Sequence, residues 1–351
     1  TQRRRQRQMC IRDRFATMAL DVNGLSWLVQ QDAVEWVEPR PFYEIMNSKG
    51  IEVMNVDDTW DNTNMANIDS SWSGLDGSGI IVTVADTGLD NGVNNTNMHP
   101  DFRDHITGIL SFPPSASTCT AYGLSPCGDD AEDHHGHGTH VAGSVLGDGT
   151  HSNGDIIGAA PEAHLLVHSI ATTHNGEEKL LGIPNDLDDL FSLAWANGSR
   201  IHTNSWGSAV AGQYTSSSMQ ADSSARTHDE MVILFAAANE GVDNNRDGEI
   251  DLDSMGSPAT AKNVLTVGAS ENNRGNMTYV WGSSDYGSPI STDRLADNPE
   301  GMAAFSSRGP TDDGRLKPDF SAPGTMILST KSRSRTSTGW LAHNASYTYM
   351  G

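Results

Sequence analysis

Four apolar runs of strand length recur along the chain, and each ends in polar or small residues that predict a turn. They cover residues 80–90, 158–170, 201–207 and 232–241 and are rich in Val, Ile and Leu, which favours β-strands. Between the second and third runs, residues 185–198 carry an apolar stripe at helical spacing after an Asp-rich start, and Gly198 follows it. The stripe consists of Leu187, Leu190, Phe191, Ala194 and Trp195. This alternation predicts an α/β fold of three layers, with a doubly wound, mostly parallel sheet.

Three polar residues that could take part in catalysis lie at predicted strand ends or at a predicted helix start. Asp86 closes the run VTVAD, Asn239 follows the run VILFAAA, and His137 stands in HHGHGTHVAGSVLG before a helical run of small residues. The carboxyl ends of parallel strands meet at one edge of a sheet, where ligands bind. Taken alone, an Asp in this context more often caps a loop or a helix.

The histidine cluster at 134–140 also permits a metal site, because histidines often bind zinc. Its spacing is not HExxH, and Gly136 and Gly138 indicate a turn rather than a ligand-bearing helix face. This mismatch argues against a metal site, and we expect His134 and His135 to lie solvated in a loop.

In this order, the three segments resemble the subtilisin-like serine proteases, or subtilases. FSSRGPT at 305–311 and KPDFSAPGTMILS at 317–329 extend the resemblance, which spans residues 50–351 and is closest to large calcium-dependent bacterial alkaline subtilases. It implies a subtilisin-like fold and a serine endopeptidase that hydrolyses peptide bonds by acyl transfer. Asp86 would orient His137, His137 would be the general base, and Asn239 would donate to the oxyanion. His140, one turn into the helix, would have a structural role.

The resemblance also implies where substrate binds. Ser205, Trp206 and Gly207 would pair with an extended polypeptide as an added strand. The facing wall of the first specificity pocket would contain Ala237 and Ala238. The family usually has Gly where this chain has Ala238, so the preferred side chain stays open.

In the family, a segment like YTYMG runs directly into Gly-Thr-Ser, which carries the nucleophile, but this sequence stops at Gly351. Ser329, Ser334 and Ser346 lack that context. We therefore expect a C-terminally truncated peptidase domain that is inactive as given. Two alternatives stay open, an inactive homologue that binds peptides in its cleft and a calcium-binding structural protein.

DNNRDGEIDLDS at 243–254 matches the front half of a calcium loop, with oxygen-bearing side chains at alternating positions and Gly248 at the turn. Ser254 stands where a bidentate Glu is usual. The expected Ca²⁺ ligands are Asp243, Asn245, Asp247, the Glu249 carbonyl, Asp251 and, in place of that Glu, Asp253. The alternative is a solvated acidic turn.

Composition narrows the class of partners and the compartment. With 22 basic and 45 acidic residues the net charge is −23, so neither nucleic acid nor an anionic membrane is an expected partner. No apolar run approaches the roughly 20 residues of a membrane helix. Cys119 and Cys127 flank a short loop, either as a disulfide of a secreted protein or as two thiols, and Cys10 has no evident partner.

Three segments are expected. Residues 1–14 form a basic run that is not a signal peptide and that we expect to be non-native or disordered. Residues 15–45 resemble the end of a subtilase propeptide, with a short amphipathic helix and then β-rich sequence. Residues 46–351 form the peptidase domain. We expect a secreted monomer whose partners are a polypeptide substrate and its own propeptide.

Overall fold

The computed structural model describes residues 6–11, 14–19, 21–28, 30–31, 34–39, 48–60, 74–125, 127–128, 131–175, 177–335 and 341–350. The chain divides into two compact units, Thr1–Ile45 and Met46–Gly351. This division falls at the residue where the peptidase domain was expected to begin.

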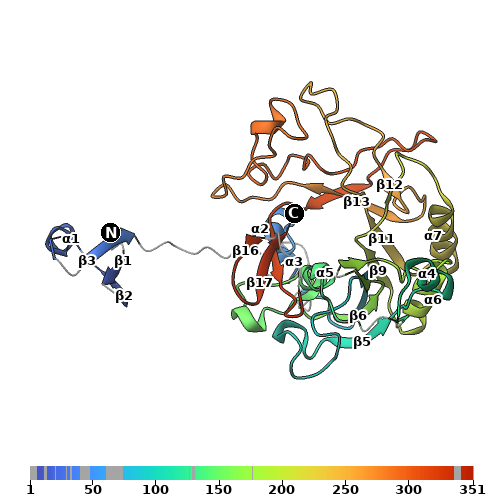
Figure 1. Ribbon diagram of the computed structural model, residues 1–351, viewed down its shortest axis with the longest axis horizontal. Helices are drawn as coiled ribbons and strands as arrows, with labels where there is room; N and C mark the ends of the chain where they lie inside the picture. Colours follow the sequence, from blue (N-terminus) through green and yellow to red (C-terminus); the bar gives the residue numbers. More distant parts are fainter. Residues whose placement is uncertain are drawn as a thin grey trace. The chain divides into compact units, whose positions relative to one another are not determined.

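The first unit is a three-stranded antiparallel sheet with one helix (Figure 1). Its elements are β1 (Gln6–Ile11), β2 (Arg14–Ala19), α1 (Val22–Leu28) and β3 (Val34–Pro39), and the strand order is β2-β1-β3. Residues 6–11 of the basic run, which was expected to be non-native or disordered, form β1, the central strand of this sheet. Backbone groups make the pairing in a β-sheet, so an arginine-rich composition does not exclude a strand.

The second unit is built on a seven-stranded sheet in which every pairing is parallel. Its order is β14-β13-β11-β9-β4-β6-β5. The strands are β4 (Ile81–Asp86), β5 (Ile106–Ser111), β6 (His164–Ser169), β9 (Ile201–Asn204), β11 (Val232–Ala236), β13 (Leu265–Ser270) and β14 (Phe320–Pro323). The chain leaves β4 in both directions across the sheet, which confirms the doubly wound α/β prediction.

Helices cover both faces of this sheet (Figure 1). Helix α5 (His137–Leu146) buries Ala142 and Leu146 with Val82 and Val84 of β4 on one face. On the other face, α6 (Asp188–Ala196) and α7 (Ser216–Thr227) pack over a core that contains Phe235 of β11. The predicted apolar stripe of α6 lies in that core, apart from Trp195, which is half-buried against it.

Residues 87–136 connect β4 to α5 and are not irregular throughout. They contain β5, which pairs with β6 at the sheet edge, and helix α4 (Ala116–Tyr122). The apolar run of β5 was missed because Thr107 and Gly108 interrupt it. A disulfide joins Cys119 of α4 to Cys127, so these cysteines are bonded rather than two thiols.

The smaller elements frame the ends of the main sheet. The helices are α2 (Ser48–Met54), α3 (Asp57–Trp60), η1 (Pro100–Phe102), η2 (Thr150–Ser152) and η3 (Ile290–Thr292). Two-stranded sheets pair β7 (Thr172–His174) with β8 (Glu177–Lys179) and β10 (Ser208–Ala209) with β12 (Gly256–Ser257). A three-stranded sheet has the order β15-β17-β16, from β15 (Ile327–Thr330), β16 (Leu341–Ala342) and β17 (Tyr347–Met350). None of the helices in the described part of the chain has the length and apolar character to cross a bilayer.

A buried histidine makes this core sensitive to acid. His168 on β6 is fully buried against Phe112, and neither ring nitrogen has a hydrogen-bond partner among the described residues. Burial lowers the pKa of His168 to about 4, so the folded state keeps it neutral while the unfolded chain takes up a proton below pH 6.5. Stability should therefore fall as the pH drops from about 6.5 to about 4.

We expect His168 to cost the fold about 2 kcal/mol on going from pH 7.5 to pH 5. Urea unfolding of wild type and His168→Leu at both pH values measures this loss, and the variant should show a shallower pH dependence. His164→Leu, at an exposed position on the same strand, is the control and should keep the wild-type slope. An unchanged slope in His168→Leu would contradict the assignment.

Candidate active site

Asp86 and His137 meet where the sheet reverses its winding. Asp86 is the last residue of β4, and His137 is the first residue of α5. The Nδ1 atom of His137 lies 2.6 Å from Oδ1 of Asp86, which also accepts a hydrogen bond from the backbone N–H of Thr87. The Asp86 side chain is 3% exposed and that of His137 is 28% exposed. The pair predicted from the sequence is therefore formed, with the imidazole reachable from solvent.

The surroundings favour the protonated form of His137. Burial acts to lower its pKa, but the charge of Asp86, the hydrogen bond to Asp86 and the charge of Asp133 outweigh burial, so the pKa is raised above 6.5. An imidazole that gains a proton readily and is held by a buried carboxylate has the properties of a general base.

Asp133 is a residue of this site that the sequence analysis missed. Its fully buried carboxylate accepts hydrogen bonds from Thr87 Oγ1 at 2.8 Å, Gly136 N at 2.6 Å, and both the backbone N and Oγ1 of Thr139 at 2.8 and 2.5 Å. It thereby joins the end of β4 to the first turn of α5, the two elements that carry Asp86 and His137. The available signal was an acid four residues before His137, which was overlooked beside the histidines.

The other histidines of the cluster have structural surroundings. His140 is buried, with Nε2 at 3.0 Å from the Ile327 carbonyl and 3.1 Å from that of Thr348, in agreement with the expected structural role. His134 and His135 were expected in solvent, but both are half-buried. Their backbone N–H groups donate to the two carboxylate oxygens of Glu178. Glu178 was also missed, because β8 is distant in sequence.

Part of the predicted substrate-binding set lines one cavity. In register, Ala85, Asn204 and Phe235 lie side by side on β4, β9 and β11, so the chain leaves all three strands at the same sheet edge. A cavity of about 250 Å³ there is lined by residues that include Ser205, Ala237, Ala238 and Asn239.

Trp206 and Gly207 do not line this cavity. The indole of Trp206 packs edge-on against Phe235, with ring centroids 5.2 Å apart. Gly207 is exposed, and a Cβ there would lie 2.9 Å from the Ser257 carbonyl. Of the predicted substrate wall, Ser205 therefore faces the cavity, whereas Trp206 supports it from the core.

Ala238 has a backbone conformation that favours glycine. Its φ is 93°, in the left-handed region, and a Cβ built on Gly256 would lie 2.8 Å from the Ala238 Cβ. The methyl group is thus both strained and close to a neighbouring strand. Where the family usually has Gly, this chain therefore has a strained Ala238.

The acidic members of the predicted calcium set are not grouped as a metal site in the described residues. Asp243 is buried and accepts backbone N–H groups from Asp247 at 3.1 Å, Gly248 at 3.0 Å and Gly287 at 2.8 Å. Burial opposes its ionisation, but these bonds outweigh burial and lower the pKa of Asp243. Among the described residues, which include all of 243–254, no three acidic, His or Cys side chains are grouped for a metal ion. As they lie, these oxygens serve the loop backbone, and calcium binding stays a prediction.

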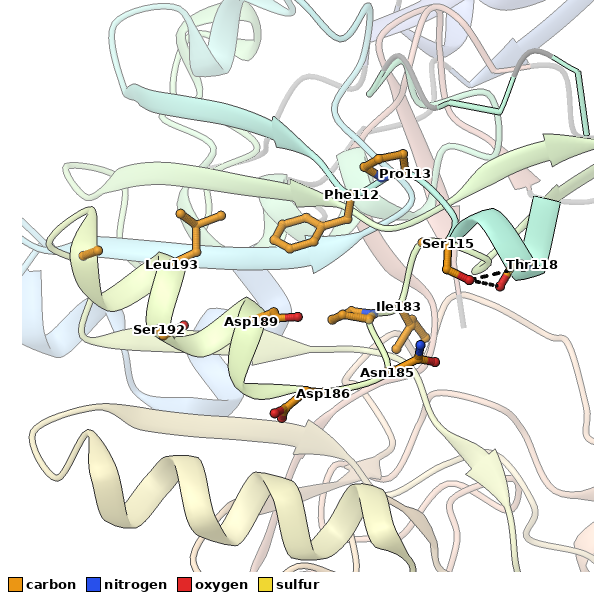
Figure 2. Close-up of a pocket in the computed structure, with 13 residues that line it drawn as sticks. Phe112, Pro113, Ser115, Thr118, Ile183, Asn185, Asp186, Asp189, Ser192 and Leu193 are labelled. Atoms are coloured by element: carbon orange, nitrogen blue, oxygen red, sulfur yellow. Dashed lines mark hydrogen bonds between the residues drawn. The ribbon is translucent and has the colours of Figure 1, made fainter. Parts of the chain in front are cut away.

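A wider pocket of about 790 Å³ lies between the end of β5, the loop before α6 and the outer face of α6 (Figure 2). Phe112 and Ile183 point into it, and Asp186 and Asp189 are its charged lining residues. Its lining has no histidine, lysine or cysteine. The pocket therefore offers shape and negative charge, and its two carboxylates have no histidine, lysine or cysteine beside them in the lining.

Removing the Asp133 carboxylate should damage the fold and the pair together. Asp133→Ala leaves four buried backbone or hydroxyl donors without their acceptor, and we expect a loss of about 3 kcal/mol or more in urea unfolding. Asp104→Ala, at an exposed aspartate, is the control and should stay within about 0.5 kcal/mol of wild type. Equal losses in both variants would show that Asp133 has no special role.

Glycine at position 238 should stabilise the protein. An L-residue in the left-handed region costs about 1–2 kcal/mol, part of which is offset by the greater freedom of glycine in the unfolded chain. We expect Ala238→Gly to gain about 1 kcal/mol in thermal or urea unfolding. Ala236→Gly, in β11 and on the same cavity, is the matched control and should lose about 0.5–1 kcal/mol. A loss in both variants would contradict the strain.

Comparisons with known proteins agree with this geometry. The model of the subtilase family, Peptidase_S8, matches residues 77–351. Serine protease AprX of Bacillus subtilis is 28% identical over 74% of this chain and 49% of its own length. A subtilisin of Bacillus sp. strain TA39 is 30% identical over 72% of this chain and 50% of its own length.

Among solved structures, MycP1 with its N-terminal propeptide removed superposes with a TM-score of 0.51 at 17% identity, over 88% of this chain and 79% of that one, which supports the fold. The chain spans between 16% and 64% of the length of the curated relatives it matches here. Since the family model covers the whole sheet together with Asp86 and His137, this chain belongs to the subtilase family.

Proposed function

We propose that this chain is the larger part of a secreted serine endopeptidase domain whose nucleophile lies in a segment beyond Gly351. The observation that carries the proposal is the Asp86 to His137 contact of 2.6 Å at the carboxyl edge of a subtilisin-like sheet. Asp86 holds the imidazole in one tautomer, and His137 takes the proton of the attacking serine and returns it to the leaving amine.

The cavity supplies the remaining parts of this mechanism. Asn239 lines it near the start of the loop that follows β11, and its amide can donate to a developing oxyanion without adding a titrating charge. Ser205 and Ala237 line the same cavity, which has no charged lining residue and accepts a neutral side chain. The backbone at 205–207 lies between β9 and β10, where an extended substrate can pair with it.

One face of the main sheet carries partly exposed apolar side chains, which favours a further segment that covers it. Val232, Leu265 and Phe320 lie on this face and are 42%, 40% and 45% exposed. Alternate residues of β11 and β13, such as Phe235 and Thr266, are buried on the opposite face. Parallel sheets are normally covered on both faces. We infer that a further segment of the full protein covers this face and brings the nucleophile to His137.

Secretion is supported by the disulfide between Cys119 and Cys127, since disulfides persist in oxidising compartments. A role for residues 15–45 as the end of a propeptide rests on the sequence resemblance. The proposed substrate is an extended polypeptide, and the proposed state is a monomer. The alternative, an inactive homologue that binds peptides, predicts that no nucleophile follows in the full coding sequence.

The test is to express the protein extended to its natural stop codon and treat it with a serine-directed phosphonate. We expect one labelled serine downstream of Gly351 and hydrolysis of unfolded protein substrates. His137→Ala should lower kcat by about 10⁶-fold and Asp86→Asn by about 10⁴-fold. His164→Ala, at an exposed histidine, is the control and should keep wild-type activity. An extended protein that is neither labelled nor active would leave the peptide-binding alternative.

A further inference from the structure

The turn that leads into His137 has its backbone donors bound by side chains. Asp133 accepts the N–H groups of Gly136 and Thr139, and Thr87 Oγ1 accepts that of Gly138. The two preceding N–H groups are bound from another part of the chain. That of His134 lies 3.2 Å from Oε1 of Glu178, and that of His135 lies 3.0 Å from Oε2. Both oxygens of one carboxylate thus bind consecutive amides just before the catalytic pair.

Glu178 reaches this turn from the hairpin of β7 and β8. Each strand of the hairpin is three residues long, and Thr173 pairs with Glu178. Glu177 and Lys179 on either side are exposed and lie 3.8 Å apart as an ion pair. Glu178 is half-buried and points the other way. The hairpin therefore presents one inward carboxylate to the turn and two outward charges to solvent.

Several charges face Glu178. Asp133 lies on the same turn as the two amides. The positive charge of His134, when this residue is protonated, acts to lower the pKa of Glu178. Behind them, Glu132 lies 3.7 Å from His134, and the positive charge of Arg335 acts on Asp133 and His135. Burial of Glu178 and the negative charge of Asp133 raise the pKa of Glu178 to about 7, against the opposing effect of the two N–H bonds.

We propose that Glu178 is a positioning residue for His137, holding the 134–136 turn through both carboxylate oxygens in its ionised form. The relevance to catalysis rests on the proposed role of His137 as general base. A carboxylate offers an acceptor to each amide, whereas a protonated carboxyl turns one oxygen into a donor that faces an N–H group. The clamp therefore loosens as the pH falls through about 7.

The direction in which stability changes with pH distinguishes this role from simple stabilisation of the fold. Because the folded pKa of Glu178 is raised, its contribution to stability is present at low pH and lost as the pH rises through about 7. Removing the charge should therefore leave the global stability at pH 8 near or above that of wild type. A residue that merely stabilised the fold through its charge would show the opposite result.

The test uses the 1–351 chain and does not require the nucleophile. In Glu178→Gln at pH 8, the amides of His134 and His135 should exchange with deuterium about tenfold faster than in wild type. The NMR titration of the His137 ring should lose the inflection near pH 7 that we expect in wild type. The His137 pKa itself should move towards 6.5, because the pair with Asp86 is less firmly held.

Glu177→Gln is the matched control, since it removes a charge from the same hairpin but points to solvent, and it should change none of these readouts. Glu178→Asp, one methylene shorter, should protect only one of the two amides and guards against misfolding of the first variant. Wild-type amide exchange and an unchanged His137 titration in Glu178→Gln would overturn the proposal. This outcome would not affect the proposed peptidase function, which phosphonate labelling tests separately.

Discussion

The site depends on one buried carboxylate, that of Asp133. It accepts hydrogen bonds from Thr87, which follows β4, and from Gly136 and Thr139 at the start of α5. The distance between Asp86 and His137 is therefore set by a third group that binds both of their elements. The charge of Asp133 is balanced by oriented N–H and O–H donors at a helix N-terminus, where a negative charge is favourable.

The close approach of these elements also requires the absence of side chains. Any Cβ at Gly138 would collide with the carbonyl oxygen of Gly88, and a Cβ at Gly88 would lie 2.5 Å from the carbonyl of Ala131. Gly88 has a φ of 124°, which favours glycine. The carboxylate can thus bridge β4 and α5 because the backbones at their ends are bare.

Patterns of neighbouring residues predicted the strands and the helix that carry Asp86, Asn239 and His137. The runs that ended at Asp86 and Asn239 and the helix at His137 were placed correctly, because strand ends and a helix start leave signals within a few residues. Asp133 and Glu178 were missed because their roles arise from partners on other elements. The strand β5 was missed because an internal glycine broke its apolar run, although a paired neighbour makes that interruption tolerable.

The 243–254 loop shows a different limit of sequence patterns. Oxygen-bearing side chains at alternating positions suit a calcium ion, and they also suit the backbone N–H groups of a tight turn. In the structure Asp243, Asn245 and Asp247 each accept backbone N–H groups of the loop. The spacing alone cannot distinguish the two uses of the same atoms.

The bond between Cys119 and Cys127 lies in a segment that forms one wall of the 790 Å³ pocket, through Ser115 and Thr118 at the start of α4. Helix α4 has seven residues and little burial of its own, so the covalent link contributes much of its order. Where the chain folds under reducing conditions, this wall would lose its restraint while the central sheet kept its shape. The width of the pocket would therefore depend on the redox conditions of the compartment as well as on the sequence.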